Sequence, residues 1–281
     1  MNSKILIQGG LGNQMFQIAF AFNRKQVERK PIVVCLKQIK PCIYFNYKPF
    51  YKKNLILGFV ITILRKLNSN SYLKYFPSVK TINDYQSPEI ISLNIQRFAT
   101  YEGTFGSIFY FQQFQNEVKN LFTLKKKYID EYNFLIGFQQ LQQKTVVLHI
   151  RRTDYKNFGN QNFGGKDLSL PNDYYINCLK KIKNLDEYNI YIIGDDIKGI
   201  DQEFTFINVH LLHFSEIIDF QIIMNADIVI AANSTFSWWA SYLNKKAEKI
   251  YMPKYWLGFH LKKLMPELIY YDKPTHWELV E

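Results

Sequence analysis

The chain has 281 residues, of which 47% are hydrophobic and 17% aromatic, and its formal net charge is +11. This composition supplies enough apolar surface for one large or two modest packed domains and excludes an intrinsically disordered protein. The longest apolar run, Leu55–Leu64, is too short to cross a bilayer, and no signal peptide precedes the first strand-like segment. Three cysteines without CxxC spacing predict neither a disulfide framework nor a zinc site, so we expect a cytoplasmic protein.

The positive charge is concentrated in the first half of the chain. Residues 1–143 contain 19 Lys and Arg against 7 Asp and Glu, whereas residues 144–281 contain 16 against 17. Such asymmetry indicates an anionic partner, for example a membrane surface, a phosphorylated acceptor or nucleic acid. A well-solvated basic face without any partner is the alternative.

The N-terminal segment predicts a strand, a glycine-rich loop, a helix and a second strand. Apolar residues 5–7 lead into Gly9–Gln14, a helix is expected from Gln14 to about Lys30 with Asn13 as its cap, and residues 32–36 form the next strand. Glycines in the loop allow the backbone to approach a ligand closely. This pattern is typical of half a Rossmann-like unit, although the GxGxxG spacing of a dinucleotide fingerprint is absent.

Residues 37–100 give no clear periodicity. Aromatic residues and lysines alternate through Tyr44–Lys53, a pattern compatible with single-stranded nucleic acid, with stacking on sugars or with an ordinary core edge. The run Leu55–Leu64, followed by Arg65-Lys66, predicts either a buried helix or one lying on lipid. Further on, Tyr110–Phe122 predicts an amphipathic helix, with the lysines of residues 125–127 at its C-terminal end.

From residue 145 onward, strands and helices alternate regularly. This alternation predicts a second doubly wound domain, with a boundary near residue 143. The predicted strands cover residues 145–150, 190–193, 204–209, 228–232 and 250–252, and the predicted helices cover residues 172–185, 215–225 and 236–243.

The strand at 145–150 ends in a cluster of charged residues, His149-Ile150-Arg151-Arg152-Thr153-Asp154. Open α/β sheets bind ligands at the carboxyl ends of their strands. Two adjacent guanidiniums at that edge favour an anion, and their forked donors match phosphate oxygens. A structural ion pair between Arg151 or Arg152 and Asp154 is the alternative.

Two further strand ends fit the same kind of ligand. Asp195-Asp196 follows the strand at 190–193, where a carboxylate could accept two N–H groups of a purine such as guanine, or could cap a turn. The segment Asn233-Ser234-Thr235 opens a helix, and a helix N-terminus is a ready phosphate site. A nucleotide diphosphate would satisfy all three clusters. No DxD and no histidine spacing typical of a metal site occurs, so we expect guanidiniums rather than a metal to neutralise the diphosphate.

Three segments, Gly9–Gln17, His149–Tyr155 and Asn233–Ala240, together resemble the three motifs of the bacterial α-1,2-fucosyltransferases and occur in the same order. The resemblance implies an α/β protein of GT-B type with two facing Rossmann-like domains. Residues 1–143 would form the acceptor-side domain and residues 144–281 the GDP-fucose-binding domain. The implied reaction is an inverting, metal-independent transfer of L-fucose from GDP-β-L-fucose to the 2-OH of a terminal galactose, giving an α-1,2 linkage on a surface glycan such as O-antigen.

The resemblance also implies roles for single residues. Arg151 would clamp the diphosphate, with Arg152 supporting the loop, and His149 together with Asp195 or Asp196 would hold guanine. The remaining expected donor contacts are Asn233, Ser234 and Thr235 with phosphate, Gly10 and Gly12 with the donor through the backbone, and Asn13 with the fucose.

The general base does not follow from the resemblance. Some more distant fucosyltransferases carry a glutamate five residues beyond the aspartate of the motif, and that position here is Gly159. Asp154 is the remaining local candidate, either as the base or as a residue that orients Arg151. An oxocarbenium-like path would need little help from a base.

Two other functions compete with this interpretation. A GDP-fucose-dependent transferase with another acceptor or linkage would differ only in the first domain, and a basic nucleic-acid-binding protein would explain the charge but not the clusters at the strand ends. We expect no cofactor and no nucleic acid. The expected partners are GDP-fucose and a galactose-terminated, lipid-linked glycan at the anionic inner face of the membrane. Lys52-Lys53 and Arg65-Lys66 are the first residues to mutate in a test of this membrane contact.

Overall fold

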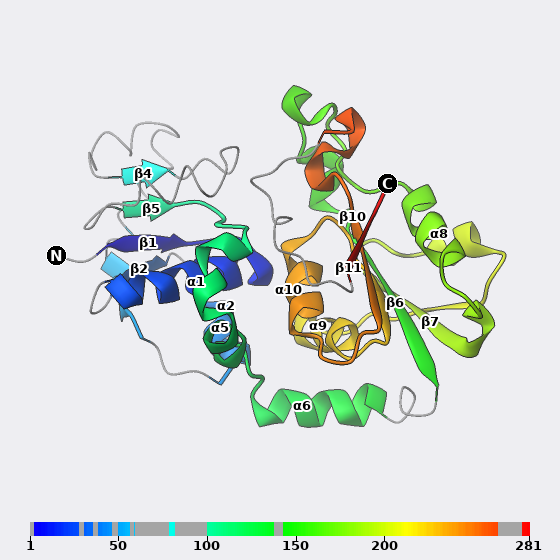
Figure 1. Cartoon of the computed structure of the whole chain (residues 1–281), viewed down its shortest axis with the longest axis horizontal. Coiled ribbons are helices and arrows are strands. Elements are labelled where there is room, and N and C mark those ends of the chain that lie inside the picture. The colour runs from blue at the N-terminus through cyan, green and yellow to red at the C-terminus, as the bar shows by residue number, and fades with distance from the viewer. Residues whose placement is uncertain are drawn as a thin grey trace. The chain divides into compact units, whose positions relative to one another are not determined.

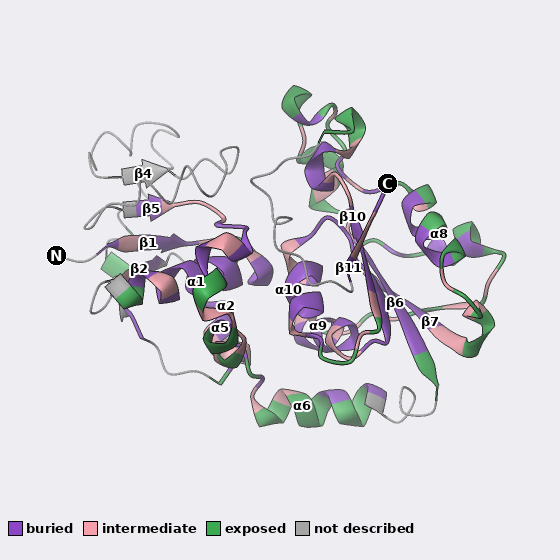
Figure 2. Ribbon diagram, in the orientation of Figure 1, coloured by how far each residue is buried: buried purple, intermediate pink, exposed green. Residues whose placement is uncertain are grey.

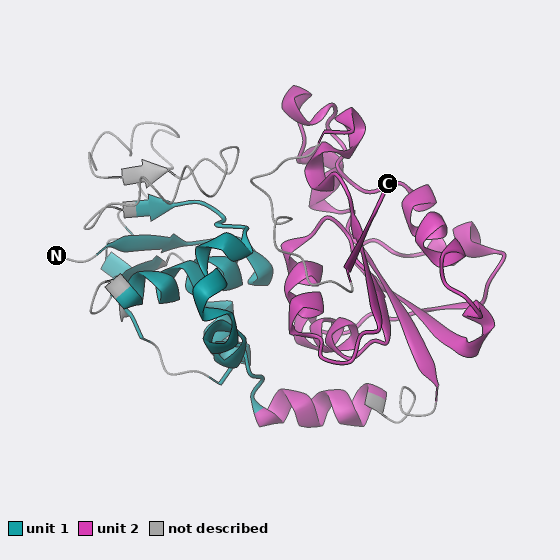
Figure 3. Cartoon of the chain, viewed as in Figure 1, with its two compact units in different colours: residues 1–125, 266–272 teal, residues 126–265, 273–281 magenta. Residues whose placement is uncertain are grey.

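The computed structural model describes residues 3–27, 31–35, 39–46, 50–56, 59, 79–81, 100–137, 143–263 and 277–281. The chain divides into two compact units, residues 1–125 with 266–272 and residues 126–265 with 273–281 (Figure 3). Each unit contains a parallel sheet with helices packed against it (Figure 1). The prediction of an α/β protein with two Rossmann-like units is thereby confirmed.

The N-terminal stretch of the first unit ends at Lys125, earlier than the predicted boundary at residue 143. Helix α6 (Lys126–Tyr132) belongs to the second unit because it packs against α9 (Glu216–Met224), where the Gln221 amide donates to the Tyr128 carbonyl at 2.9 Å. The lysine run at 125–127 therefore opens α6, whereas the sequence predicted that it closes the preceding helix. A π-helical turn, Asn133–Gly137, continues α6.

The sheet of the first unit is five-stranded and parallel, in the order β3-β2-β1-β5-β4. Lys4 of β1 pairs with Ile32 on one side and with Thr100 on the other. The bounds of the strands are β1 Lys4–Ile7, β2 Ile32–Cys35, β3 Lys52–Lys53, β4 Val79–Thr81 and β5 Thr100–Glu102.

The first helix, α1 (Leu11–Val27), begins earlier than predicted. The Gln14 N–H already donates to the Gly10 carbonyl at 3.1 Å, so Asn13 lies inside the first turn and is not the cap. Met15, Ile18, Ala19 and Phe22, which share one face of α1 by helical spacing, are all buried, and so are Phe16 and Phe20.

The remaining helices of the first unit are short. The helix predicted over Tyr110–Phe122 is wrong in its first half, because 3-10 turns occupy the segment up to Phe114 and only α5 is α-helical. Phe111, Val118 and Phe122 of the predicted apolar side are nevertheless buried, whereas Phe114 and Leu121 are half-buried. The bounds are α2 Lys40–Tyr44, η2 Ile108–Tyr110, η3 Gln112–Phe114 and α5 Gln115–Leu121.

The sheet of the second unit is six-stranded and parallel, in the order β11-β10-β9-β6-β7-β8. The segment predicted as a strand at 204–209 is wrong, because a 3-10 helix reaches Phe204 and the strand starts only at Val209. Strand β11 was not predicted. The bounds are β6 Lys144–Ile150, β7 Tyr188–Gly194, β8 Val209–Leu211, β9 Ile228–Ile230, β10 Lys249–Pro253 and β11 Trp277–Val280.

The central strand β6 is buried on both faces, as Figure 2 shows by its purple colour over most of its length. Val146, Leu148 and Ile150 join the core cluster that includes residues of α8, whereas the His149 ring packs against Phe236 of α10. The other helices are α8 Asn172–Lys180, α10 Thr235–Leu243, η5 Asp154–Asn157, η6 Gln161–Phe163, η7 Leu185–Glu187, η8 Ile200–Phe204 and η9 Trp256–Leu261.

Each sheet has one point where the order of its strands reverses. In the second unit the chain runs from β6 to β7 and β8, and then returns to the other side of β6 with β9. In the first unit the corresponding strand is β1, between β2 and β5. Ligands of open α/β sheets bind at the carboxyl ends of such strands.

The run Leu55–Leu64 lies only partly within the described residues. Leu55, Ile56 and Phe59 are helical and exposed, whereas most of the run and Arg65-Lys66 fall outside the described residues. Among the described helices, none combines the length and the apolar character that a membrane span requires.

Candidate active site

The carboxyl ends of β9, β6 and β7 lie side by side because these strands are neighbours in the sheet. The register pairs Leu148 of β6 with Ile230 and His149 with Ile193. The loops that follow the three strands carry Asn233–Thr235, Arg151-Arg152 and Asp195-Asp196, in that order across the edge. The structure therefore brings the three predicted clusters together at the switch point of the second sheet.

Two carboxylates hold the guanidinium of Arg151. Its Nη2 lies 2.7 Å from Asp154 Oδ1, its Nη1 lies 2.8 Å from Asp195 Oδ2, and its carbon lies 5.6 Å from the centre of the Tyr155 ring. The ion pair with Asp154, which was the alternative to anion binding, is thus present. A guanidinium has five N–H donors, however, and the side chain is 35% exposed, so Arg151 can bind an anion while keeping both contacts.

Asp195 organises the loop around Arg151. Its Oδ1 accepts from the backbone N–H of Arg152 at 2.5 Å and of Thr153 at 3.3 Å, and its Oδ2 accepts from the Thr153 hydroxyl at 2.6 Å. Burial alone would raise the pKa of Asp195, but these hydrogen bonds and the Arg151 charge lower it below its usual value. Both carboxylate oxygens are therefore engaged in holding the loop.

Arg152 ties the same loop to α8. Its Nη2 donates to Asn172 Oδ1 at 2.6 Å, and its carbonyl accepts from the Lys156 N–H at 3.0 Å. Because Asn172 is the first residue of α8, this contact fixes the loop against a helix of the same unit. The arrangement fits the supporting role that the resemblance implies.

His149 is a buried polar residue at the end of β6. Its side chain packs 5.4 Å from the Phe236 ring, and its Nδ1 has no hydrogen-bond partner among the described residues. Burial and, to a lesser degree, the Arg151 charge lower the pKa of His149 to about 4, so the imidazole is neutral at pH 7. A buried nitrogen without a hydrogen-bond partner lowers the stability of the fold, and a ligand that hydrogen-bonded to it would recover part of that free energy.

The loop after β9 forms the predicted helix N-terminus. Ser234 Oγ accepts from the Phe236 N–H at 3.3 Å and caps α10, whose first residue is Thr235. Asn233 is fully buried, and its Nδ2 donates to the Leu168 carbonyl at 2.9 Å, but its Oδ1 has no partner within the described part of the chain. The sequence did not predict Tyr155, whose hydroxyl donates to the Asn233 carbonyl at 2.8 Å and links this loop to that of Arg151.

The structure excludes a side chain at the position where distant fucosyltransferases carry a glutamate. A Cβ added to Gly159 would lie 2.2 Å from the Gly165 carbonyl oxygen, so the loop backbone would have to move to admit any other residue. Asp154, whose side chain is 57% exposed, remains as a carboxylate beside Arg151. Both of its expected roles, base and orienting residue, stay compatible with this geometry.

A pocket of about 350 Å³ opens beside the ends of β7 and β8. Asp196, which also pairs with Lys156, is one of its lining residues, and Asp195 is not. The turn depends on Gly194 (φ +148°), where a Cβ would lie 1.9 Å from the Ile150 carbonyl oxygen. The lining residues are Gly194, Asp196, Ile197, Lys198, Leu211, Leu212 and His213.

In the first unit, two buried glutamines of α1 hold the loops at the carboxyl edge of the sheet. Gln17 accepts from the Gln8 N–H at 2.9 Å and donates to the Gly103 carbonyl at 3.0 Å, which ties the end of β1 to the end of β5. Gln14 donates to the Gly9 carbonyl at 3.0 Å and accepts from the Lys40 N–H at 2.8 Å. Both glutamines lie within the first motif, Gly9–Gln17, and no role was predicted for them from the sequence.

The three candidates in this glycine-rich segment lie in different surroundings. Gly10 is exposed, and a Cβ there would meet no atom within 4 Å, whereas Gly12 is buried in the first turn of α1 and Asn13 is half-buried. The backbone turns at Gly9 (φ +82°), where a Cβ would lie 2.8 Å from Asn13 Nδ2. Contacts of Gly10, Gly12 and Asn13 with a donor remain predictions.

Within the described residues, no three His, Cys, Asp or Glu side chains gather in a way that would hold a metal ion. The metal independence of the reaction stays a prediction.

The fold resembles that of the NodZ α-1,6-fucosyltransferase, in a crystal structure soaked with GDP-fucose, with a TM-score of 0.54. The two sequences are 11% identical, and the match covers 89% of this chain and 94% of that one, so the GT-B-like fold is shared. An Escherichia coli protein described as the O-antigen biosynthesis glycosyltransferase WbnK is 25% identical over 90% of this chain and 94% of its own length. A Caenorhabditis elegans galactoside 2-alpha-L-fucosyltransferase is 24% identical, over 88% of this chain and 70% of that protein.

The sequence profile of glycosyl transferase family 11 matches residues 63–260, which include the second and third motifs and most of the residues of the candidate site. The match confirms the resemblance drawn from the motifs. The chain belongs to glycosyl transferase family 11.

Proposed function

We propose that this protein transfers L-fucose from GDP-β-L-fucose to the 2-hydroxyl of a terminal galactose on a glycan acceptor. The main support for this proposal is the cluster at the switch point of the second sheet. There Arg151 lies between Asp154 and Asp195, and the N-terminus of α10 follows the neighbouring strand. The name of the Caenorhabditis elegans relative supports both the fucosyl donor and the galactoside acceptor. A GDP-fucose-dependent transferase with another acceptor or linkage is the alternative.

In this proposal, the diphosphate binds between the Arg151 guanidinium and the N-terminus of α10. Both groups present N–H donors and positive charge, and both would stabilise the negative charge that develops on the leaving GDP. The contacts from Asp195 and Asn172 fix the loop before the donor binds, so little reorganisation is required.

The geometry favours Asp196 over Asp195 as the residue that recognises guanine. Asp195 uses both carboxylate oxygens on the Arg151 loop, whereas Asp196 lines the pocket beside β7 and β8. Among the described residues, Asp196 is paired only through Oδ2, with the Lys156 ammonium. A carboxylate in that pocket can accept the N1–H and the exocyclic N–H of guanine in parallel. Nδ1 of the neutral His149 is a second site for a hydrogen bond to the donor.

Asp154 is the proposed base, and its contact with Arg151 gives the competing role of an orienting residue. If Asp154 accepts the acceptor proton, Asp154→Asn lowers kcat far more than it weakens GDP binding. If Asp154 only orients Arg151, turnover and GDP affinity fall together. An Asp154→Asn enzyme with full activity would contradict both roles.

We further propose that the reaction needs no metal ion, because guanidinium and helix N–H groups supply the positive charge. Turnover in excess EDTA should equal that in untreated buffer. Loss of activity in chelator that Mg²⁺ or Mn²⁺ restores would overturn this part of the proposal.

The function is tested in two steps. GDP should raise the unfolding temperature more than UDP, ADP or CMP at equal concentration, because a ligand specific for the native state stabilises it. GDP-fucose should then be consumed with galactose-terminated oligosaccharides, and NMR of the product should show an α-1,2 linkage. Consumption without that linkage would favour the alternative acceptor or linkage.

We also propose that the first unit contacts an anionic membrane surface at the cytoplasmic face. Leu55, Ile56 and Phe59 are 64%, 81% and 68% exposed, and they lie within six residues of the exposed Lys53. Apolar side chains beside basic residues suit an interface with anionic lipid, where each cation contributes about 1 kcal/mol.

Vesicle co-sedimentation tests the membrane contact. The protein should bind anionic vesicles at low salt and dissociate as salt rises, and Ile56→Asp should weaken the binding. Phe134→Asp is a matched control, because Phe134 is 86% exposed in the second unit. Equal binding to neutral and anionic vesicles at low salt would contradict the proposal.

A further inference from the structure

An exposed aromatic ring lies next to the Arg151 cluster. Phe158 directly follows η5, and its side chain is 55% exposed. Its ring stacks on that of Tyr155, with centroids 5.7 Å apart and an interplanar angle of 15°. Since Tyr155 also contacts the Arg151 guanidinium, Phe158 is the outer member of a stack that begins at the proposed diphosphate clamp.

The loop that follows Phe158 is held in one conformation by several independent contacts. The Gly159 N–H donates to the Lys166 carbonyl at 2.8 Å, and the Gly165 N–H donates to the Asn160 carbonyl at 3.2 Å. Phe163 anchors the loop from within, as its side chain is only 4% exposed. An ordered loop at the carboxyl edge of a sheet is suited to binding, because its groups are positioned before the ligand arrives.

The same loop forms an open pocket of about 390 Å³ on the surface, lined by Asn160, Gln161, Gly164, Gly165 and Lys166. Side-chain amides can both donate to and accept from hydroxyl groups, and an ammonium donates to them. Phe158, two residues before Asn160 in the chain, adds an exposed aromatic face of the kind that covers the apolar C–H surface of a sugar ring. A carbohydrate presents both kinds of surface together.

The position of the loop separates it from the proposed guanine pocket. Leu168 accepts from Asn233 after β9, and the Asp167 carbonyl lies 2.6 Å from Nε2 of His260 in η9, which follows β10. Helices η6 and η9 accordingly lie side by side at the top of the second unit in Figure 1. The loop thus extends over the β9–β10 side of β6, whereas the guanine pocket lies on the β7–β8 side.

We propose that Phe158 and the pocket of residues 160–166 form a subsite for a sugar of the acceptor glycan beyond the galactose that receives fucose. The inference rests on the proposed function, because it takes the nucleotide to occupy the β7–β8 side and the diphosphate to contact Arg151. The sugars then lie on the other side of the clamp, where this loop supplies an aromatic face and amides. The subsite selects acceptors that are longer than a simple galactoside.

The test compares Phe158→Ala with Phe206→Ala. Phe206 is a matched control, because it is 54% exposed and lies just before β8, at the opposite edge of the same sheet. KM is measured for methyl galactoside, for a galactose-terminated tetrasaccharide and for GDP-fucose, each with the other substrate at saturation.

Phe158→Ala should raise the KM of the tetrasaccharide about tenfold, the factor expected for the loss of one aromatic contact. The rise should be much smaller for methyl galactoside and for GDP-fucose, and Phe158→Tyr should retain the wild-type values. Phe206→Ala should leave all three KM values unchanged.

An unchanged tetrasaccharide KM in Phe158→Ala, or an equal rise in the KM of GDP-fucose, would overturn the subsite. The second result would mean that Phe158 acts through Tyr155 on the donor. A wild-type enzyme that transfers no fucose to any acceptor would instead overturn the proposed function itself.

Discussion

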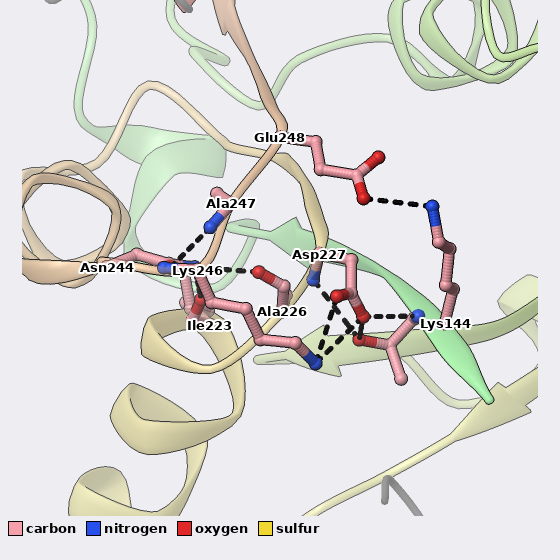
Figure 4. A network of polar contacts seen from close by, with 9 residues as sticks. Lys144, Ile223, Ala226, Asp227, Asn244, Lys246, Ala247 and Glu248 are labelled. Atoms are coloured by element: carbon pink, nitrogen blue, oxygen red, sulfur yellow. Dashed lines mark hydrogen bonds and ion pairs between the residues drawn. The ribbon is translucent and has the colours of Figure 1, made fainter. Parts of the chain in front are cut away.

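The two edges of the second sheet use similar polar residues in opposite ways. At the amino edge, Asp227 Oδ2 accepts from the Thr145 N–H at 2.8 Å and the Thr145 hydroxyl at 3.1 Å, and the Lys246 ammonium lies 3.0 Å away (Figure 4). Asn244 donates to two carbonyls, those of Ile223 and Ala226, and accepts from two backbone N–H groups. Every hydrogen-bonding group of that amide is satisfied within the fold.

At the carboxyl edge, polar groups are left incomplete. His149 Nδ1 and Asn233 Oδ1 are buried without a partner among the described residues, and the Arg151 charge is partly exposed. Groups at the amino edge stabilise the sheet, whereas those at the carboxyl edge keep hydrogen-bonding capacity that the proposed donor could use. Mutations at the two edges should therefore affect different quantities.

The largest effect is expected for Arg151→Lys. Lysine keeps the charge but loses the two-pronged donor geometry, so kcat should fall by about 10²–10³. Initial rates of fucose transfer measure the effect, and thermal unfolding should show that the variant is folded. Turnover close to wild type would return Arg151 to a purely structural role.

Asp227→Ala tests the amino edge. It leaves Thr145 and Lys246 without their buried acceptor, so the free energy of unfolding should fall by about 3 kcal/mol, with kcat unchanged at a temperature where the variant is folded. All four tryptophans lie in the second unit, so urea unfolding followed by fluorescence reports on this unit. Glu248→Ala, which removes only the exposed ion pair with Lys144, is the control and should change little.

Substitutions of the two neighbouring aspartates at the carboxyl edge should have different effects on the affinities for GDP and IDP. Asp196→Asn should lower the affinity for GDP about tenfold. It should also reduce the preference for GDP over IDP, because the exocyclic amine of guanine loses its carboxylate acceptor. Asp195→Asn should weaken both nucleotides alike, since it disturbs the Arg151 loop. If calorimetry showed that Asp195→Asn, and not Asp196→Asn, reduces the preference for GDP over IDP, guanine recognition would belong to Asp195.

The smallest effect concerns Asp219 in α9, near the end of β8. Burial raises its pKa to about 7, although the Phe214 N–H, 3.3 Å from its Oδ1, opposes the shift. A raised pKa means that the stability present below about pH 4 is lost as pH rises toward 7, by on the order of 1 kcal/mol after solvent screening. Asp219→Asn should remove that decline between pH 4 and 7 in thermal unfolding. A decline of the same size in the variant would assign it to another group.

Much of the fold and of the site could be predicted because the signals are local. The apolar run before His149 and the polar residues after Ile150 place Arg151 at the end of a strand without any knowledge of its neighbours. The same holds for Asn233–Thr235, since a polar cap before an apolar helix is read from consecutive residues. Parallel pairing then forces such strand ends to one edge.

The errors and omissions have a common physical cause. Strand β8 was predicted too early and β11 was missed, because a short edge strand is defined by its partner and not by its own periodicity. The assignment of α6 to the second unit depends on its packing against α9, which no pattern within residues 126–132 reveals.

The sequence by itself determined the residue types of the site, their order and the family, since these are carried by short contiguous motifs. Only the tertiary structure decided how the side chains are used. It commits Asp195 to the Arg151 loop, places Asp196 in a pocket and connects Tyr155 to Asn233. These contacts join residues about 40 or 80 positions apart, so they arise from the packing of strands and loops that local patterns do not encode.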